Sequence, residues 1–476
     1  MPVQMAMMMV MVEKVKAILA ENEDLLNGEL SPENAEAVSR VMTEAASQVW
    51  VEGFRTWLKA HETEAPLIEM GGKSYRYKLD VEKEFLTPGG TMTIARRVYQ
   101  PDAGGPCHVP LDTAWGMENE YATVEVRDAA LYAVALCTPL ETETLLAKSA
   151  LFHPSATAIK HMAKRMGTWL EGWEDELLPV VRAEEILPEE TRVLCASLDG
   201  VNVLLAEPGV KRGRPAERPG VQAADKESAT CYKNAMVGSI SLYGEVPEDE
   251  KTPERLVSRY AARMPESRSP VFKRKFETEL RDLDRRLPSH VVRILLNDGA
   301  RGLWSYADEN PLFDGYEKLV DFHHAEEHLS RAAETLFGKS SVKAERWYDR
   351  HRGLLLEKDD GAQRALDSLA YYRRVVKLSP SRRTALGVEE TFFSNNRHRM
   401  EYARFRRNGW PIGSGPVEAA CKSIVKTRLG RSGMRWSRSG GQHILTLRTF
   451  VKSQRWDAMW KYYKRFQHDQ SLQLVT

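Results

Sequence analysis

Three acidic residues of this sequence have the type and spacing of a site that acts on nucleic acid. Asp199 and Asp298 each follow an apolar run and precede a glycine. Glu418 lies in residues 413–422, GSGPVEAACK, at the expected start of a helix within the most basic part of the chain. Carboxylates are preferred ligands of Mg²⁺, and two such ions about 4 Å apart can activate an attacking oxygen and neutralise a leaving one. The three residues therefore predict a two-metal site that cleaves or joins a polyanion.

Each of the three residues also has a purely structural explanation. Asp-Gly at 199–200 and Asn-Asp-Gly at 297–299 are typical turn sequences, because Asp and Asn tolerate unusual backbone angles and glycine permits a positive φ. If Gly415 is an N-cap and Pro416 the first helical residue, Glu418 is the third, where a carboxylate stabilises the start of a helix. The combination of the three, rather than any one of them, favours chemistry.

The distribution of charge supports a polyanionic substrate. The chain has 476 residues and a formal net charge of only +1. Residues 381–476, however, hold 19 Lys and Arg against 6 Asp and Glu, a net charge of +13, so the rest of the chain carries −12. A basic C-terminal part of this kind favours a surface for nucleic acid.

Cysteine usage and hydropathy indicate a cytoplasmic protein. The five cysteines are scattered without a C-x-x-C pair, which offers neither a disulfide framework nor a cysteine zinc site and fits a reducing compartment. The Met-rich start continues into an amphipathic run, so we expect a helix there rather than a signal peptide. No apolar stretch reaches the roughly 20 residues that span a bilayer.

Periodicity and turn residues divide the chain into six regions that position these carboxylates. The expected regions are 1–62 (helical), 63–135 (a small β-containing module), 136–185 (helix-turn-helix-like and DNA-binding), 190–324 (first part of the core), 325–408 (helical insertion) and 409–476 (second part of the core with basic C-terminal helices). In the third region, a helix exposing Lys160, His161, Lys164 and Arg165 could enter a DNA groove. An ordinary helical hairpin with solvated cations accounts for the same pattern.

The core region contains strands that end near the two aspartates. Apolar runs predict strands at 192–207, 229–243, 291–296 and 316–322, and a basic loop lies at 211–215. Residues 252–287 have a helical composition, interrupted near Pro265 and Pro270.

Several segments resemble the DDE transposases encoded by bacterial insertion sequences, in particular the ISKra-type group. Residues 408–422, NGWPIGSGPVEAACK, are similar to the Glu-bearing motif of that group, and the similarity continues through RL, SGMRWS, GGQ and LTLR in the following 26 residues. Residues 198–200 (LDG) and 297–300 (NDGA) look like its two Asp motifs. Residues 320–329 (VDFHHAEEHL) resemble the Asp-x-x-His element that follows the second Asp.

The resemblance implies an α/β fold: an RNase H-like catalytic core with an all-helical insertion, preceded by helical and small β or helix-turn-helix DNA-binding modules. It makes Asp199, Asp298 and Glu418 the catalytic ligands of two Mg²⁺ or Mn²⁺ ions, with Asp321 and His324 as accessory residues. The expected reaction is strand cleavage at transposon ends and strand transfer into target double-stranded DNA. Paired ends further imply a homodimer or higher oligomer on DNA, in the nucleoid of a bacterial cytoplasm.

Basic residues after Glu418 are the expected contacts to DNA. Lys422 and Lys426 follow Glu418 by four and eight residues, so the three share a helix face and the lysines could hold phosphates. A surface Glu–Lys pair is the alternative. The other candidates for binding the backbone or stacking on a base are Arg428, Arg431, Arg435, Trp436 and Arg438. A solvated basic loop would have the same composition.

Two other functions remain compatible with the sequence. Residues 324–328 read H-x-x-E-H, the zinc signature of inverted metallopeptidases, in which His324 and His328 would share a helix face. No convincing acidic third ligand is evident downstream of this motif. A catalytically silent DNA-binding regulator derived from a transposase is the other alternative, against which the intact acidic triad argues.

Overall fold

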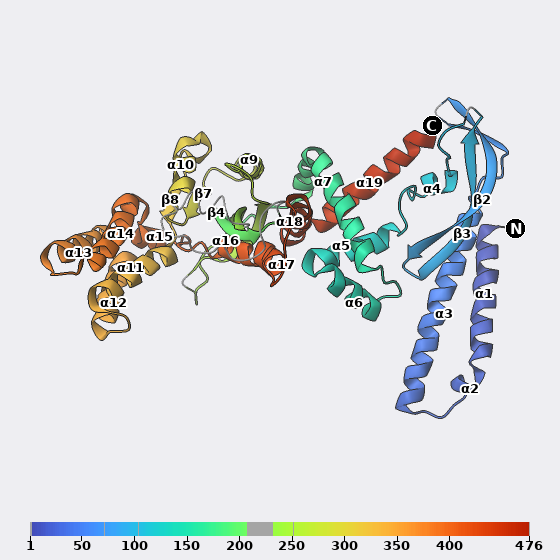
Figure 1. Cartoon of the computed structure of the whole chain (residues 1–476), viewed down its shortest axis with the longest axis horizontal. Helices are drawn as coiled ribbons and strands as arrows, with labels where there is room; N and C mark the ends of the chain where they lie inside the picture. Colours follow the sequence, from blue (N-terminus) through green and yellow to red (C-terminus); the bar gives the residue numbers. More distant parts are fainter. Residues whose placement is uncertain (1, 71, 103, 207–231, 251, 476) are drawn as a thin grey trace. The chain divides into compact units, whose positions relative to one another are not determined.

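The computed structural model describes residues 2–70, 72–102, 104–206, 232–250 and 252–475. The chain forms two compact units, Met1–Val181 with Arg455–Thr476, and Arg182–Gln454 (Figure 1). Both are mixtures of helices and sheet with helices in excess, so the chain is a mixed α/β protein. The basic loop predicted at 211–215 lies outside the described residues.

The first unit begins with a helical hairpin and a small sheet. Helix α1 (Val3–Glu21) packs against α3 (Pro32–Lys59), with α2 (Glu23–Leu26) between them in the chain. Strands β1 (Leu67–Met70), β2 (Lys73–Thr87) and β3 (Gly90–Pro101) follow as an antiparallel sheet of order β1-β2-β3.

The rest of the first unit is helical. Its helices are α4 (Pro110–Ala114), α5 (Val124–Leu136), α6 (Pro139–Ser149), α7 (Ala156–Glu184, through Val181) and α19 (Trp456–Val475). The pair α6 and α7 lies where the helix-turn-helix-like region was predicted, and a capping box of Thr138 and Glu141 starts α6. The predicted basic face of α7 is exposed, which leaves both explanations of that face open.

The second unit is built on a five-stranded sheet of order β6-β5-β4-β7-β8. Strands β4 (Val193–Leu204), β5 (Tyr232–Tyr243) and β6 (Arg255–Arg263) pair antiparallel, whereas β7 (Val292–Asn297) and β8 (Glu317–Val320) pair parallel to β4 and to each other. The prediction of a helix across 252–287 is wrong for its first part, which is β6. The charged composition suggested a helix, but the segment pairs with the free edge of β5.

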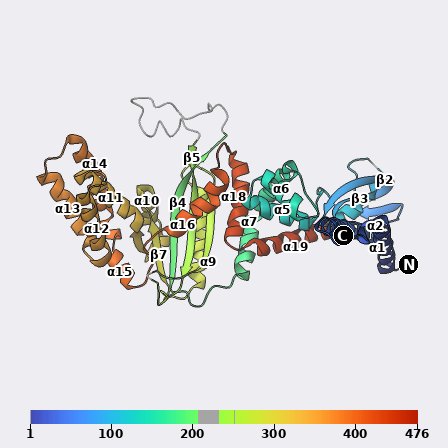
Figure 2. The same ribbon diagram turned by 90° about the horizontal axis from the view of Figure 1, so that it is seen from below.

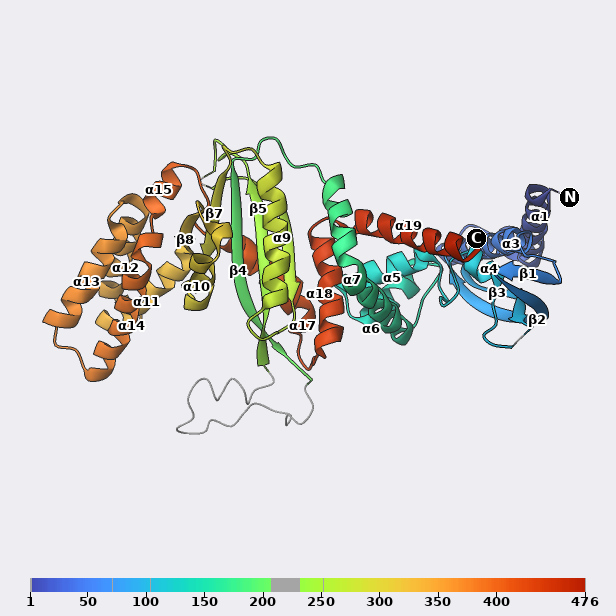
Figure 3. The same ribbon diagram turned by 90° about the horizontal axis from the view of Figure 1, so that it is seen from above.

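Helices cover both faces of this sheet. Figures 2 and 3 view it from opposite sides: α9 (Pro270–Arg286) lies over one face and α16 (Gly415–Ala420) over the other. Helix α10 (Arg301–Glu309) and the 3₁₀ turn η1 (Pro311–Phe313) connect β7 to β8.

The helical insertion shares its core with the sheet. It consists of α11 (Phe322–Phe337), α12 (Val342–Glu357), α13 (Gly361–Val375), α14 (Pro380–Asn396), η2 (Arg397–Arg399) and α15 (Tyr402–Arg407). It starts three residues before the predicted boundary, because Asp321 ends β8 and caps α11. Ile294 of the sheet, Leu329 of α11 and Phe393 of α14 belong to one buried hydrophobic cluster.

The C-terminal part of the second unit contains an element that the sequence did not predict. After α16 comes a π-helical turn, η3 (Cys421–Lys426), then α17 (Thr427–Leu429) and α18 (Arg438–Lys452). Arg448 of α18 is buried and donates from Nε to the carbonyl of Ile424 at 2.7 Å and from Nη2 to the carbonyl of Ser423. The guanidinium therefore satisfies carbonyl groups of the wide turn, a type that often occurs at functional sites.

A buried ionic cluster joins α9, β6 and the segment before β4. Arg259 Nη1 lies 3.2 Å from Glu279 Oε2 and 3.0 Å from Asp282 Oδ2, and its Nη2 pairs with Glu185. Arg182 Nη2 lies 2.7 Å from Glu279 Oε1. These carboxylates are thus neutralised by arginines within the fold.

Within the described residues, none of the helices is both long and apolar enough to cross a membrane.

Candidate active site

The sheet places Asp199 beside Asp298. The parallel register pairs Val193 with Val292 and continues to Ala196 with Leu295, so the same offset sets residue 199 opposite residue 298. Beyond the last paired residues, the Leu198 N–H donates to Asn297 Oδ1 at 2.8 Å. This bond ties β4 to the end of β7 immediately before the two aspartates.

Asp199 is a partly buried carboxylate with two local donors. Its Oδ1 accepts from the Gly200 N–H at 2.6 Å, and its Oδ2 from the Cys421 thiol, with 3.2 Å between Sγ and oxygen. Burial raises the pKa of Asp199, and the charges of Asp298 and Glu418 raise it further, while the two hydrogen bonds oppose the shift. The three predicted carboxylates therefore act on one another electrostatically.

Asp298 forms the turn that the structural explanation expected and also faces the site. Its Oδ1 accepts from the Ala300 N–H at 2.9 Å, and its carbonyl accepts from Trp304 Nε1 at 2.7 Å. Gly299 lies against the ring of Phe392 on α14: a Cβ at position 299 would be 2.3 Å from Cε2 of that ring. Glycine is needed here for close approach, which fixes the insertion to the loop that carries Asp298.

Glu418 lies after the helical insertion, on the first turn of α16. The helix begins at Gly415 with Ser414 as N-cap, so the predicted N-cap is wrong by one residue and Glu418 is the fourth helical residue. The Ser414 hydroxyl donates to Glu418 Oε1 at 3.2 Å. The side chain is exposed, and α16 packs against β4 and β5.

These carboxylates are close enough to interact but are not arranged as a ligand set. In the described part of the chain, no three His, Cys, Asp or Glu side chains lie together in a way that could hold a metal ion. Each of the three instead accepts from a neighbour of its own, namely Cys421, Ala300 or Ser414. The same described residues supply no ion pair to Asp199, Asp298 or Glu418.

Asp321 connects the elements that carry Asp298 and Glu418. It is only 1% exposed; its Oδ1 accepts from the His324 N–H at 2.9 Å and its Oδ2 from the Ser414 N–H. Its own N–H donates to the carbonyl of Asn297 at 2.8 Å. One buried carboxylate thus links the end of β7, the start of α11 and the N-cap of α16.

The histidines of the H-x-x-E-H motif pack against the insertion. His328 stacks on Phe392 with 3.4 Å between ring centroids, and its Nδ1 lies 2.5 Å from Glu389 Oε2. His324 contacts the same ring edge-on at 5.6 Å. Burial lowers the pKa of His328, and Glu389 opposes that shift. Sequence reasoning missed Glu389, an acidic neighbour 61 residues downstream of the motif, and gave Phe392 no role.

Comparison with known proteins adds little to this geometry. No protein-family model matches the sequence, and no curated protein matches it. Among solved structures, a chain of the Drosophila P element transposase strand transfer complex is similar over 75% of this chain and 85% of that chain, with 12% sequence identity and a TM-score of 0.24. A TM-score of 0.24 is too low to establish a shared fold, so we rest the function on the site itself.

The predicted DNA-binding residues divide into exposed and buried ones. Lys422 and Lys426 are exposed on η3, although the π-helical turn replaces the regular α-helical face that was predicted. Arg435 and Arg438 are also exposed, and Arg431 is partly buried, with its Nε donating to the carbonyl of Thr427 at 3.0 Å.

Arg428 does not fit its predicted contact with DNA. It is 1% exposed, and its guanidinium lies 5.0 Å from the ring centre of Trp436. Trp436 is partly buried and bonds through its backbone to Leu204 and Ala206 at the end of β4. The pair therefore packs the C-terminal segment against β4 rather than offering a surface to a ligand.

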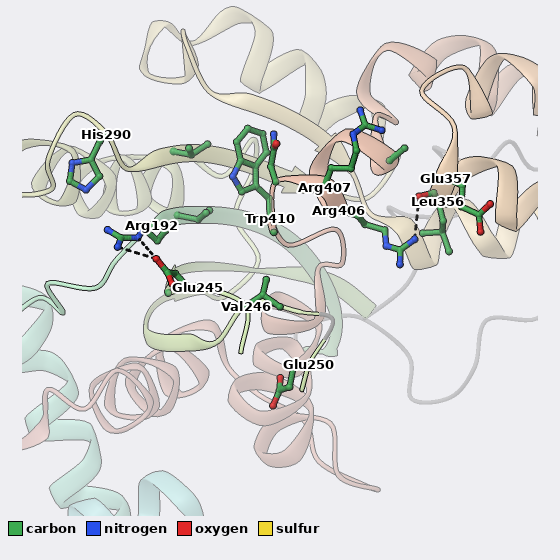
Figure 4. A pocket seen from close by; sticks show the side chains of 16 residues that line it. Arg192, Glu245, Val246, Glu250, His290, Leu356, Glu357, Arg406, Arg407 and Trp410 are labelled. Carbon is green, nitrogen blue, oxygen red and sulfur yellow. Dashed lines mark hydrogen bonds and ion pairs between the residues drawn. The ribbon is translucent and has the colours of Figure 1, made fainter. Parts of the chain in front are cut away.

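A cleft of about 960 Å³ lies at the other end of the sheet (Figure 4). It is lined by Val193 and Val292, where β4 and β7 begin, and by Trp410. An ion pair between Arg192 and Glu245 borders it, with 3.1 Å between nitrogen and oxygen. Because Asp199 and Asp298 lie beyond the opposite end of β7, this cleft is not part of the carboxylate site.

Proposed function

We propose that the chain is a DNA transposase whose Asp199, Asp298 and Glu418 bind two Mg²⁺ or Mn²⁺ ions for strand cleavage and strand transfer. The observation that carries the proposal is that three carboxylates, from β4, the end of β7 and α16, lie close enough to influence one another's charge, with no ion-paired cation among the described residues. Three antiparallel strands followed by two parallel ones support an RNase H-like core, in which carboxylates appear in this order along the chain.

The bound ions would supply an activated attacking oxygen and charge neutralisation at the leaving oxygen. The residues of the chain prepare that site. Cys421 and Gly200 fix the orientation of the Asp199 carboxylate, and Asn297 holds the two aspartate strands together. To join them, Glu418 would turn away from Ser414, which costs a single part-buried hydrogen bond of about 1 kcal/mol.

DNA would be held by exposed cations next to these carboxylates. Lys422 and Lys426 extend from the turn that follows Glu418, where they can bind phosphates of the strand to be cut. We assign recognition of the terminal repeats to the first unit, whose helix α7 has an exposed basic face. Action on paired ends would require a homodimer or higher oligomer on the DNA.

The deciding experiment is cleavage of a labelled duplex from the end of the element by the full-length chain. We expect nicking with Mg²⁺ or Mn²⁺, none with EDTA, and none by Glu418→Gln at unchanged DNA affinity. Cleavage by Glu418→Gln at the wild-type rate would disprove the assignment.

One observation favours a second candidate, a catalytically silent DNA-binding regulator. Each carboxylate accepts a hydrogen bond from a local donor instead of facing a common point. Calorimetric titration of the DNA-bound chain with Mn²⁺ separates the two functions. A regulator takes up no Mn²⁺ that depends on Asp199, whereas a transposase loses its Mn²⁺ uptake in Asp199→Asn.

A further inference from the structure

The helical insertion carries a concentrated positive charge at one end. The 21 residues 368–388 contain five basic side chains and no acidic one. They cover the last two turns of α13, the connecting segment 376–379 and the first half of α14. Figures 1 and 3 show α13 and α14 lying side by side in the insertion.

These cations are exposed and largely unpaired. Arg373 pairs with Glu390, with 2.8 Å between Nε and Oε2. Within the described ranges, Arg374, Lys377, Arg382 and Arg383 form no ion pair, and all four side chains are exposed. We call these four residues the basic tip.

A shallow cleft lies beside the basic tip. It has a volume of about 520 Å³ and is lined by α13 and α14, with Arg383 and the threonines 384 and 391 among its residues. Both hydroxyl groups donate within α14, Thr384 to the carbonyl of Pro380 at 3.0 Å and Thr391 to that of Gly387 at 2.7 Å, so the donor to a phosphate oxygen in this cleft is the Arg383 guanidinium.

The position of the charges argues against a purely structural role. Arg374 lies in the last turn of α13, where a cation stabilises the helix. Arg382 and Arg383, however, are in the first turn of α14, which contains no acidic residue. Cations at a helix start are repelled by the positive end of the helix dipole, so the fold gains nothing from these two arginines.

We propose that the basic tip binds the phosphate backbone of duplex DNA beside the segment that is cut. The proposal rests on the proposed function, because it takes the substrate to be DNA. Four unpaired cations suit sequence-independent contact with phosphates, and arginine binds phosphate oxygens in a bidentate manner.

Helix α14 connects the basic tip to the candidate active site. Arg383 and Phe392 are nine residues apart on this helix, a rise of about 14 Å, and Phe392 packs on Gly299 next to Asp298. Duplex bound at the tip is therefore held at a fixed distance from Asp298, less than the roughly 34 Å of one helical turn of DNA. The basic tip positions the substrate and takes no part in the chemistry.

The test compares two fourfold variants of the full-length chain. The first neutralises the basic tip: Arg374→Gln, Lys377→Gln, Arg382→Gln and Arg383→Gln. The second removes the same charge from exposed positions elsewhere in the insertion: Lys339→Gln, Lys343→Gln, Arg346→Gln and Arg350→Gln. All eight residues are exposed, so both variants should melt at the wild-type temperature. Binding to a labelled random duplex is measured by fluorescence anisotropy at several salt concentrations without divalent metal.

We expect the tip variant to bind at least tenfold more weakly near 100 mM salt. Its plot of log affinity against log salt should be shallower by about 3 to 4, since each lost phosphate contact removes roughly 0.9 from the slope. The second variant should retain its affinity within about twofold. It loses the same net charge, but from positions that do not contact the DNA. Equal losses in the two variants would overturn the proposal, as would a tip variant that binds DNA normally but no longer binds vesicles of anionic lipid.

Failure of this proposal can be told apart from failure of the proposed function. If the tip variant shows the shallower slope but the wild-type chain never nicks DNA with any divalent metal, the basic tip stands and the catalytic assignment falls. If the wild-type chain nicks DNA and the tip variant binds it with an unchanged slope, the catalytic assignment stands and the basic tip falls.

Discussion

The second unit contains two groups of acidic residues that the fold treats in opposite ways. Glu279 and Asp282 lie in the buried ionic cluster, where Arg259 contacts both of them. Asp199 on β4 and Asp298 directly after β7 have no such partner among the described residues. A buried acid that loses its partner destabilises a fold, and like charges left together raise one another's pKa unless a cation neutralises them. The absence of a partner is therefore a better sign of function than the presence of an acid.

The largest expected effect tests the unpartnered acids. Asp199→Asn should lower the rate of DNA cleavage by about three orders of magnitude, as expected when several kcal/mol of transition-state stabilisation is lost. The melting temperature should stay unchanged or rise, because burial and two neighbouring charges already raise the pKa of Asp199. A clear drop in melting temperature would show that Asp199 supports the fold. Asp199 would then not differ from the ion-paired acids Glu279 and Asp282.

Removing an arginine from the buried ionic cluster should lower the stability of the fold, unlike the substitution of Asp199. Arg259→Met removes the cation that contacts both Glu279 and Asp282, while Arg182 stays on Glu279 and Arg286 on Asp282. We therefore expect the free energy of unfolding to fall by about 3 kcal/mol in urea titration, the lower end of the loss from a broken buried pair. Arg364→Met, which breaks an exposed pair with Asp360, is the control and should leave the free energy of unfolding nearly unchanged. Equal losses in the two variants would count against a structural role for the buried cluster.

A third prediction tests whether the unpartnered acids require exact placement. Gly299→Ala introduces a Cβ into the ring of Phe392, and we expect cleavage to fall about tenfold while DNA affinity is kept. Adding Phe392→Leu should restore most of the rate because it frees space. Gly302→Ala is the matched control, since a Cβ there meets nothing within 4 Å. A double variant as slow as Gly299→Ala would show that the contact does not position Asp298.

The smallest effect concerns Glu389, an acid whose partner can change charge. Burial lowers the pKa of His328, so the unfolded chain takes up this proton at a higher pH than the folded one. The stability that His328 contributes is therefore complete above its ordinary pKa near 6.5 and is lost as the pH falls below it. Melting curves between pH 7.5 and 5.5 should show a loss in the wild-type chain that is smaller in His328→Gln. Identical pH profiles would exclude this coupling.

The sequence predicted what depends on local pattern. Apolar runs ending in Asp-Gly located β4 and β7, and helical composition located the start of the insertion within three residues of its observed position. The predicted placement of the carboxylates on neighbouring strands and on a later helix agrees with the structure, whereas their role as metal ligands stays a prediction.

What the sequence missed depends on contacts between distant segments. Strand β6 forms because β5 offers a free edge, which composition does not reveal. The burial of Arg428 requires the end of β4 beneath Trp436. The π-helical turn is contacted by Arg448, which lies more than 20 residues further along the chain. The Cys421 thiol could have been suspected, because it follows Glu418 by only three residues in the sequence.

The hydrophobic cluster that unites Ile294, Leu329 and Phe393 has a consequence for how this unit can be divided. The helical insertion contributes side chains to the hydrophobic core of the sheet, so it cannot be deleted without exposing that core. A chain shortened by residues 322–408 would leave apolar strands open to water, and the intact unit should therefore melt in one calorimetric transition. Although the insertion interrupts the sheet's sequence between β8 and α16, it belongs to the same cooperative folding unit.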